Sequence, residues 1–340
     1  MTTQTQPLIQ IRNLKKHFKL KDKRKLHAVD GLDFDIYPGE TLGLVGESGC
    51  GKSTVGNVIM RLLPPTDGEI HFEGRSVFGA TGREKLDFCK LMQLIFQDPY
   101  SSLNPRKTIR SILAEAYKIH NVASGKELDR QIMTLCADTG ISLDMLSKYP
   151  HELDGGKRQI VGIARALSLS PKFIVCDEPV SALDVSIQAT IINLLMDLQE
   201  KRGLSYLFIS HDLSVVRHIS NRIAVMYLGQ IIELAPTDTI FSNALHPYTI
   251  ALLSAVPKVK IGTKIKRIVL KGDVPSPVNP SPVCRFAPRC WMASEICGQQ
   301  APEYKEVEPG HYVACHFYQE SRSLAEEIQG DKSSVREALS

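Results

Sequence analysis

The chain of 340 residues has no long apolar run and no secretory signal at its start. None of its hydrophobic stretches reaches the roughly 18 residues that cross a membrane. The first residues, "MTTQTQPLIQIRN", lack the basic region, apolar segment and small-residue cleavage site of a signal peptide. We therefore expect no membrane span and a cytosolic chain, in which thiols stay mostly reduced. Its cysteines then predict a metal or redox site before they predict disulfides.

The sequence also lacks a strong charge of either sign and any internal repeat. Its formal net charge is +4, with 43% hydrophobic and 23% charged residues. This composition is typical of an ordinary globular protein that can bury a sizeable core. The mild charge gives no argument for a nucleic-acid partner. The length suits one large domain with a smaller one, or two modest domains.

Apolar runs that fit strands alternate with segments that fit helices. We expect strands at residues 8–14, 28–36, 41–46, 172–177 and 204–210, and helices at 111–119, 131–141 and 187–202. Gly203 is a probable C-cap of the last helix. This alternation predicts an α/β fold with a mainly parallel sheet. The basic segment at 15–25 predicts a solvated loop, with a nucleotide or phospholipid contact as the alternative.

A glycine-rich motif follows the third of these strands. Residues 46–54, "GESGCGKST", match G-x-x-x-x-G-K-[ST] between an apolar run and a helical segment, the context that this phosphate-binding loop requires. Its backbone N–H groups can cradle phosphates, Lys52 can reach the β- and γ-phosphates, and Ser53 can ligate Mg²⁺. The predicted ATP-binding residues here are Gly46, Ser48, Gly49, Cys50, Gly51, Lys52, Ser53 and Thr54.

Two carboxylates end a later buried strand in "FIVCDEP", residues 173–179. We expect Asp177 to hold Mg²⁺, directly or through water. Glu178 is then placed to orient and deprotonate an attacking water. Positioning and charge neutralisation of this kind carry phosphoryl transfer.

The order of the remaining motifs resembles the ATP-binding cassette (ABC) ATPases. "LDGGKRQIVGIARAL" at 153–167 resembles their signature, "SALD" at 181–184 their dimer-contacting loop, "ISHD" at 209–212 their switch-histidine loop, and "LIFQDP" at 94–99 their glutamine loop. The resemblance implies a P-loop NTPase core with an antiparallel β part and a helical subdomain at about 100–160.

The same resemblance assigns roles to single residues. It implies that Glu178, His211 and Gln97 are catalytic, with Gln97 joining Ser53 and Asp177 around Mg²⁺. Phe18 resembles the aromatic that stacks on adenine, although His17 or another neighbour could do so. The remaining implied residues are Leu153, Asp154, Gly155, Gly156 and Lys157, which face a partner's ATP, and Ser181, Ala182, Leu183 and Asp184 in the dimer loop.

The C-terminal third resembles the ATPase subunits of dipeptide and oligopeptide importers, with nickel importers as close relatives. The segment "HPYTIALLSAVP" and the later cysteines carry this resemblance. It implies ATP-driven peptide import, a second ATPase chain, two permeases, an extracellular binding protein, and a peripheral position on the cytoplasmic face of the inner membrane. Residues 100–109 are the candidate permease contact. A solute such as nickel, a soluble ABC ATPase acting on DNA, and a metal or redox sensor stay open as alternatives.

This resemblance also divides the chain. We expect an ATPase domain at 1–257, a proline-rich linker at 258–283, a cysteine-bearing module at 284–320 and a polar tail at 321–340. The module's cysteines, Cys284, Cys290, Cys297 and Cys315, resemble a [4Fe–4S] site. Their spacing, C-x5-C-x6-C-x17-C, matches neither the ferredoxin run nor the common zinc pattern. Zinc, disulfides or free thiols therefore remain possible, and the other four cysteines are expected to be core or loop residues.

The signature departs from the family's usual L-S-G-G-Q, because Asp154 replaces the serine and Lys157 the glutamine. A carboxylate facing a partner's ATP would be repelled by the phosphates. Lys157 could offset this charge, or Asp154 could turn away as a helix N-cap. We expect one slow composite site and hence a heterodimer with a different ATPase chain.

Overall fold

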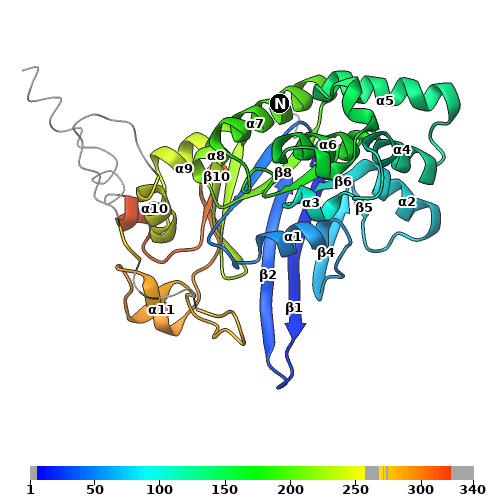
Figure 1. Cartoon of the computed structure of the whole chain (residues 1–340). Coiled ribbons are helices and arrows are strands. Elements are labelled where there is room, and N and C mark those ends of the chain that lie inside the picture. The colour runs from blue at the N-terminus through cyan, green and yellow to red at the C-terminus, as the bar shows by residue number, and fades with distance from the viewer. Residues whose placement is uncertain (1–5, 257–267, 271, 273–274, 323–340) are drawn as a thin grey trace, which may run out of the picture.

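Residues 6–256, 268–270, 272 and 275–322 are described by the structure, a computed structural model (Figure 1). The larger sheet has the order β11-β12-β10-β9-β3-β8-β7-β6. Its strands are β3 (Thr41–Val45), β6 (Met92–Ile95), β7 (Phe173–Asp177), β8 (Ser205–Ser210), β9 (Arg222–Tyr227), β10 (Gln230–Pro236), β11 (Lys305–Glu308) and β12 (His311–Val313). The pairs from β9 to β6 are parallel, and β10, β12 and β11 add antiparallel strands at one edge.

Both faces of this sheet are covered, as the apolar runs of its parallel strands predict. Val175 and Leu207 point into one hydrophobic core, whereas their neighbours Ile174 and Phe208 point into another. Every residue of β3 and β8 is buried. The predicted α/β fold with a mainly parallel sheet is thus confirmed.

A second, antiparallel sheet consists of β1 (Ile9–Lys19), β2 (Lys25–Ile36), β4 (Asp67–Phe72) and β5 (Arg75–Ser76), in the order β2-β1-β4-β5. The expectation of a loop at 15–25 is wrong for most of that segment, because β1 continues through Lys19 and pairs with β2 along its length. Backbone pairing to β2 holds this basic stretch extended despite its charge. Figure 1 shows β1 and β2 as a long arm that reaches below the rest of the molecule.

The helices are α1 (Lys52–Ile59), α2 (Gly82–Leu91), α3 (Pro99–Ser102), α4 (Ile109–Ile119), α5 (Gly125–Thr139), α6 (Gly155–Leu167), α7 (Val185–Arg202), α8 (Leu213–Ile219), α9 (Thr237–Ser242), α10 (Pro247–Ser254) and α11 (Glu295–Gln299). Gly203 ends α7 with a φ of 64°, as its predicted role as a C-cap requires. Helices α3, α4 and α5 pack on α6. They lie on the side of the molecule opposite α11 (Figure 1).

The cysteine-bearing segment shares the core sheet. Strand β12 pairs with β10, and the buried carboxylate of Glu233 on β10 lies 2.8 Å from Nε2 of His311 on β12. The same carboxylate accepts hydrogen bonds from the backbone N–H groups of Leu245 and His246. The segment expected to be a module is therefore continuous with the ATPase core through one sheet. Half of the expected linker (258–267, 271, 273–274) and the tail from 323 onward lie outside the described residues.

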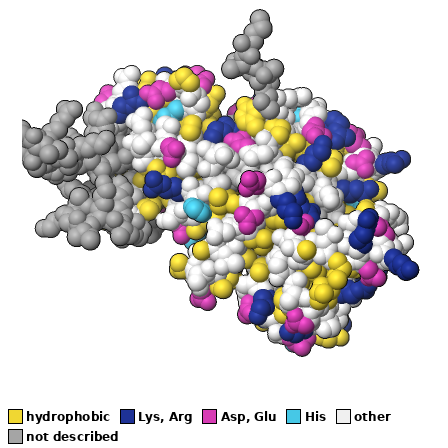
Figure 2. All heavy atoms as spheres, turned by 90° about the horizontal axis from the view of Figure 1, so that it is seen from above, with side chains coloured by type: hydrophobic (Ala, Val, Ile, Leu, Met, Phe, Trp, Pro, Cys, Tyr) yellow, Lys and Arg dark blue, Asp and Glu magenta, His cyan; other side chains and the backbone are white. Residues whose placement is uncertain are grey.

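In the described part of the chain no helix combines the length and the apolar character that a bilayer crossing demands. The face in Figure 2 carries Lys and Arg side chains interspersed with Asp and Glu. A nucleic-acid surface is instead typically a continuous basic patch.

Candidate functional site

The phosphate loop lies between β3 and α1, where a tight backbone is required. Gly51 has a φ of 109°, and a Cβ there would lie 2.0 Å from the carbonyl oxygen of Ala28 on β2. Helix α1 begins at the next residue, Lys52. The buried Lys52 ammonium donates to the carbonyl oxygens of Gly46 (2.8 Å) and Glu47 (3.0 Å). The loop thus holds its cation beside the helix N-terminus, where phosphate binding is favoured.

The two predicted magnesium ligands are in direct contact. The Ser53 hydroxyl donates to Oδ1 of Asp177 at 2.8 Å. Burial raises the pKa of Asp177, and the nearby charge of Glu178 raises it further. A hydroxyl and a carboxylate are the hard oxygen ligands that Mg²⁺ prefers, so these residues fit the ion chemically.

Three predicted catalytic side chains meet at Glu178. Gln97 Nε2 donates to Glu178 Oε2 at 3.2 Å, and His211 Nδ1 lies 3.2 Å from Glu178 Oε1. The Glu178 side chain is 13% exposed, whereas that of His211 is 55% exposed. Glu178 has a φ of 46°, a left-handed conformation that non-glycine residues rarely adopt. The end of β7 therefore aims this carboxylate at both partners by a strained turn.

These groups line one cleft of about 640 Å³. Of the predicted ATP-site residues it includes Phe18, Gly46, Ser48, Gly49, Gly51, Lys52, Ser53, Thr54, Gln97, Glu178 and His211. The Cys50 side chain is buried behind the loop, and burial raises the pKa of its thiol. Any contact of Cys50 with phosphate would have to come from its backbone.

The other end of the cleft is apolar and is lined by Phe18, Leu26, Ala28, Leu252 and Pro277. The Lys16 ammonium lies 5.1 Å from the centre of the Phe18 ring. This end of the cleft could hold the base of a nucleotide against Phe18.

The alternative that His17 stacks on adenine is disfavoured because its ring is already occupied. His17 stacks on His27 with 3.7 Å between ring centres, and its Nε2 lies 2.8 Å from Oδ1 of Asp30. Burial would raise the pKa of Asp30, but hydrogen bonds from His27, Arg285 and His17 outweigh it and lower that pKa to about 2. Phe18 is therefore the better candidate for the base contact.

The signature and the dimer loop lie side by side, outside this cleft. Asp154 is the N-cap of α6, where Oδ1 accepts from the Lys157 backbone N–H and Oδ2 lies 2.8 Å from the Lys157 ammonium. A Cβ on Gly155 would lie 3.3 Å from the Leu183 side chain. The Ser181 hydroxyl donates to the Glu178 backbone carbonyl at 3.1 Å, which joins the dimer loop to the end of β7. Asp154 thus caps its helix and pairs with Lys157, the two outcomes expected from the sequence.

The backbone N–H of Cys284 donates to the Cys297 carbonyl at 3.1 Å. Burial raises the pKa values of Cys284, Cys290 and Cys315, and neighbouring cysteines of the set raise them further. The pKa reaches about 11 for Cys290 and about 12 for Cys315. Backbone N–H groups two residues further on donate to Cys290 (3.3 Å) and Cys315 (3.4 Å). All eight cysteines are free of disulfides.

Comparisons with known proteins identify the family to which this chain belongs. The sequence model of the ABC transporter family matches residues 29–181, and that of the oligopeptide/dipeptide transporter C-terminal region matches residues 232–297. Two Bacillus subtilis (strain 168) relatives are the putative oligopeptide transport ATP-binding protein YkfD (50% identity, 320 residues) and the oligopeptide transport ATP-binding protein AppF (51%, 321 residues). The alignments cover 93% and 92% of this chain and 97% of each relative. The chain belongs to the ABC transporter ATP-binding protein family.

Solved structures give the same result for the fold. A dimeric ATP-binding cassette in a post-hydrolysis state, bound to ADP and Pi, superposes with a TM-score of 0.62 at 26% identity over 67% of this chain and 98% of its own. A component of the cbiONQ transporter complex of Clostridium perfringens gives 0.61 at 24% identity over 69% and 90%. This ABC protein is therefore an ATP-hydrolysing enzyme with a P-loop NTPase fold.

Several residues that contact the phosphate loop or the strands beside it lie outside the sequence motifs. The Tyr248 hydroxyl accepts from the Glu47 backbone N–H at 2.9 Å, and Arg289 forms two hydrogen bonds with the Glu47 carboxylate. Arg285 pairs with Asp30. Tyr248 and Arg289 lie 201 and 242 positions after Glu47, and Arg285 lies 255 positions after Asp30. The one sequence signal for Arg285 and Arg289 is that both lie between Cys284 and Cys290.

Proposed function

We propose that this ABC ATPase powers the import of oligopeptides through a membrane permease. The observation that carries the proposal is the match of residues 232–297 to the oligopeptide/dipeptide transporter C-terminal region, attached to a complete nucleotide cleft. The relatives named above are oligopeptide transport proteins, which favours peptides over nickel and over an action on DNA.

In this proposal the phosphate loop binds ATP and Lys52 moves its ammonium from two loop carbonyls to the β- and γ-phosphates. Ser53, Asp177 and Gln97 hold Mg²⁺, which neutralises the phosphate charge. Phe18 stacks on the adenine. Each role is supported by the position of the side chain on the cleft or directly behind it.

Glu178 is the proposed general base for water. Gln97 and His211 each contact one of its two oxygens, and each oxygen keeps a further lone pair that can accept a proton from water. The His211 side chain is 55% exposed, whereas that of Glu178 is 13% exposed. The imidazole therefore has room to turn toward the γ-phosphate. Hydrolysis would then depend on the local rearrangement of this triad.

The signature residues and the dimer loop are proposed to face a second ATPase chain. The large apolar side chains of Val185 and Ile187, beside the signature, are 82% and 37% exposed. Exposed apolar groups next to functional glycines support a contact surface. Because Asp154 brings a carboxylate to the position of the family's serine, we propose a heterodimer in which the site completed by this signature is slow.

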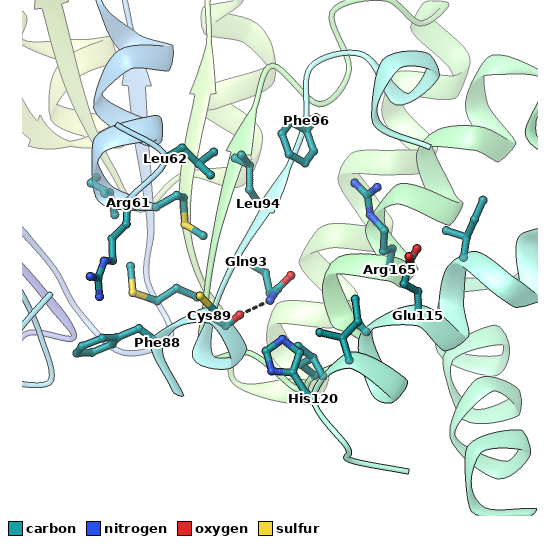
Figure 3. A pocket seen from close by; sticks show the side chains of 17 residues that line it. Arg61, Leu62, Phe88, Cys89, Gln93, Leu94, Phe96, Glu115, His120 and Arg165 are labelled. Carbon is teal, nitrogen blue, oxygen red and sulfur yellow. Dashed lines mark hydrogen bonds between the residues drawn. The ribbon is translucent and has the colours of Figure 1, made fainter. Parts of the chain in front are cut away.

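A groove of about 340 Å³ between the sheet edge and the helical region is the proposed permease contact. Figure 3 shows Leu62, Leu94 and Phe96 on one side and Glu115 and Arg165 on the other. The side chains of Leu62 and Phe96 remain 57% and 42% exposed. The mixed apolar and charged lining fits an amphipathic segment of a permease, and its place next to Gln97 would relay motion from the nucleotide.

The candidate contact at 100–109 borders this groove. The ring of Tyr100, which is 61% exposed, lies 3.7 Å from the Arg158 guanidinium, and Arg165 donates to the Ser102 carbonyl. The start of α6 is thereby tied to the segment beside the groove. We propose that both form the permease surface, at the cytoplasmic face of the membrane.

We further propose that Cys284, Cys290, Cys297 and Cys315 hold a [4Fe–4S] cluster. Tetrahedral zinc at about 2.3 Å from each sulfur needs thiolates about 3.8 Å apart. No three of these thiols offer Sγ atoms that all lie within 4.8 Å of one another. A cluster places iron and sulfide between its thiolates and needs the wider spacing. Because burial raises the pKa values of Cys290 and Cys315, a bound cationic group would favour their ionised form.

The cluster is tested by anaerobic purification with iron, sulfide and zinc measured per chain. About four irons and four sulfides that are lost together in Cys284→Ser would support it. Zinc without sulfide would contradict it and leave the ATPase untouched.

Transport is tested in proteoliposomes that contain the chain, a second ATPase and two permeases, with a binding protein outside. ATP-dependent uptake of a labelled oligopeptide, absent with Glu178→Gln, would support the proposal. Uptake of nickel but not of peptide would contradict it.

A further inference from the structure

Glu47, the second residue of the phosphate loop, is held at three places. Its backbone N–H donates to the Tyr248 hydroxyl at 2.9 Å, and its carbonyl oxygen accepts from the Lys52 ammonium at 3.0 Å. Its carboxylate accepts from Nη1 and Nη2 of Arg289 at 2.6 and 3.0 Å. The first two contacts come from residues of the ATPase core, whereas the third reaches in from the cysteine-bearing segment.

A carboxylate at this position opposes the binding of phosphate groups by the loop. Glu47 lines the same cleft as Ser48 and Lys52, where a triphosphate of several negative charges binds. Like charges at close range repel strongly when water is partly excluded. An uncompensated Glu47 would therefore weaken ATP binding and push the loop away from its bound form.

Arg289 removes this conflict in a fixed geometry. It ends the short helix Ala287–Arg289, and its side chain is only 7% exposed. The planar guanidinium grips both carboxylate oxygens, which fixes their direction as well as their charge. A lysine could supply the charge but not this two-point grip.

We propose that Arg289 is a positioning residue of the ATP site, which neutralises Glu47 and holds the phosphate loop in its binding conformation. The cysteine-bearing segment thereby contributes to nucleotide affinity without touching the nucleotide. This inference deepens the proposed function, because it rests on the binding of ATP at this loop. The two can still fail separately: wild-type chain that does not bind Mg-ATP would overturn the function, and normal binding by an Arg289 variant would overturn the inference.

The test is a charge cycle on the full-length chain, purified anaerobically. Mg-ATP affinity, KM and kcat are measured for wild type, Arg289→Gln, Glu47→Gln and the double variant. We expect Arg289→Gln to weaken Mg-ATP binding about tenfold, equivalent to ~1.4 kcal/mol, with KM rising and kcat nearly unchanged. Glu47→Gln loses the two-point grip but leaves no negative charge beside the phosphates, so it should weaken Mg-ATP binding less than Arg289→Gln does, and the double variant should bind Mg-ATP more tightly than Arg289→Gln. Equal losses in Arg289→Gln and the double variant would overturn the proposal.

Two further measurements separate neutralisation from a general structural role. The loss in Arg289→Gln should shrink at high salt, because screening weakens repulsion but not packing. Arg322→Gln is the matched control, since Arg322 lies in the same C-terminal segment and pairs with Glu308 instead of the loop, and it should leave ATP affinity unchanged at either salt concentration. Should Arg289→Gln not fold, recovery of folding and of ATP affinity in the double variant would support the pairing, and a double variant that folds but binds ATP weakly would overturn it.

Discussion

Within the phosphate loop the residues that meet are neighbours in the sequence, whereas beside Phe18 they come from opposite ends of the chain. Lys52 contacts Gly46 across six positions. By contrast, Leu26 on β2 bridges to Val278, the His27 N–H donates to the Pro277 carbonyl, and Arg285 pairs with Asp30. The conformation of the phosphate loop is thus encoded locally, whereas the residues around the base, like the contacts of Tyr248 and Arg289 to Glu47, are brought together by the tertiary fold. The experiments below test this difference between the two parts of the cleft.

The largest effect is expected at the phosphate end from Glu178→Gln. This change keeps the shape of the side chain but removes the general base, which typically contributes 10²–10⁴ in rate, so kcat should fall by roughly that factor. Single-turnover ATP hydrolysis and ATP binding are measured in parallel. Binding should persist, whereas Lys52→Ala, the control, should lose binding itself. Hydrolysis within tenfold of wild type would contradict the role of Glu178.

At the base end, Phe18→Ala should weaken ATP binding without a comparable loss of kcat. Stacking of a base on an aromatic side chain contributes about 1–3 kcal/mol, which corresponds to roughly five- to hundredfold in affinity. Binding is followed by titration with ATP and with GTP. Because stacking tolerates any base, both nucleotides should lose affinity together, and Phe18→Trp should restore them. Unchanged affinity in Phe18→Ala would exclude this side chain from the base contact.

Acid should lower the free energy of unfolding by protonating Asp30, whose carboxylate pairs with His17, His27 and Arg285. Its folded-state pKa of about 2 lies below the usual value of 3.8. The resulting stability, about 2 kcal/mol at most, is therefore fully present above about pH 4 and is lost as the pH falls toward 2. Urea unfolding of wild type and Asp30→Asn is compared across this range. The difference in unfolding free energy between them should diminish toward pH 2, and a difference that is constant with pH would contradict the assignment.

The smallest effect is expected at the signature, outside both ends of the cleft. Asp154→Ala removes the N-cap of α6 and should cost about 1 kcal/mol of stability. Asp154→Ser keeps a cap and removes the charge, so stability should change less. In the assembled transporter, ATP turnover by Asp154→Ser should equal or exceed that of wild type. A loss of turnover in Asp154→Ser would show that the carboxylate is needed there.

The same contrast explains what could be predicted from the sequence. The loop at 46–54 and the strand that ends at Asp177 carry their geometry in short motifs. The family resemblance pointed to Gln97 and His211, whose side chains the fold brings to Glu178. The buried strands β3 and β8 were visible as apolar runs. These features depend on local spacing, which a single sequence displays directly.

The rest depends on contacts across the chain, which local patterns do not contain. The basic residues before Lys19 suggested a loop, yet pairing with β2 makes them a strand. Nothing near Glu47 in the sequence points to Arg289, because the two residues are 242 positions apart in the chain. The continuity of the cysteine-bearing segment with the core sheet was hidden for the same reason.

The hairpin of β11 and β12 also protects the sheet from self-association. Without it, β10 would present its unpaired backbone at the sheet margin, an edge on which another chain could add as a strand. Instead the outermost strand is β11, only four residues long, with the charged side chains of Lys305, Glu306 and Glu308. Short, charged edges resist such pairing. Removal of the C-terminal segment would therefore do more than delete four cysteines, because it would expose the edge of β10 as a template for aggregation.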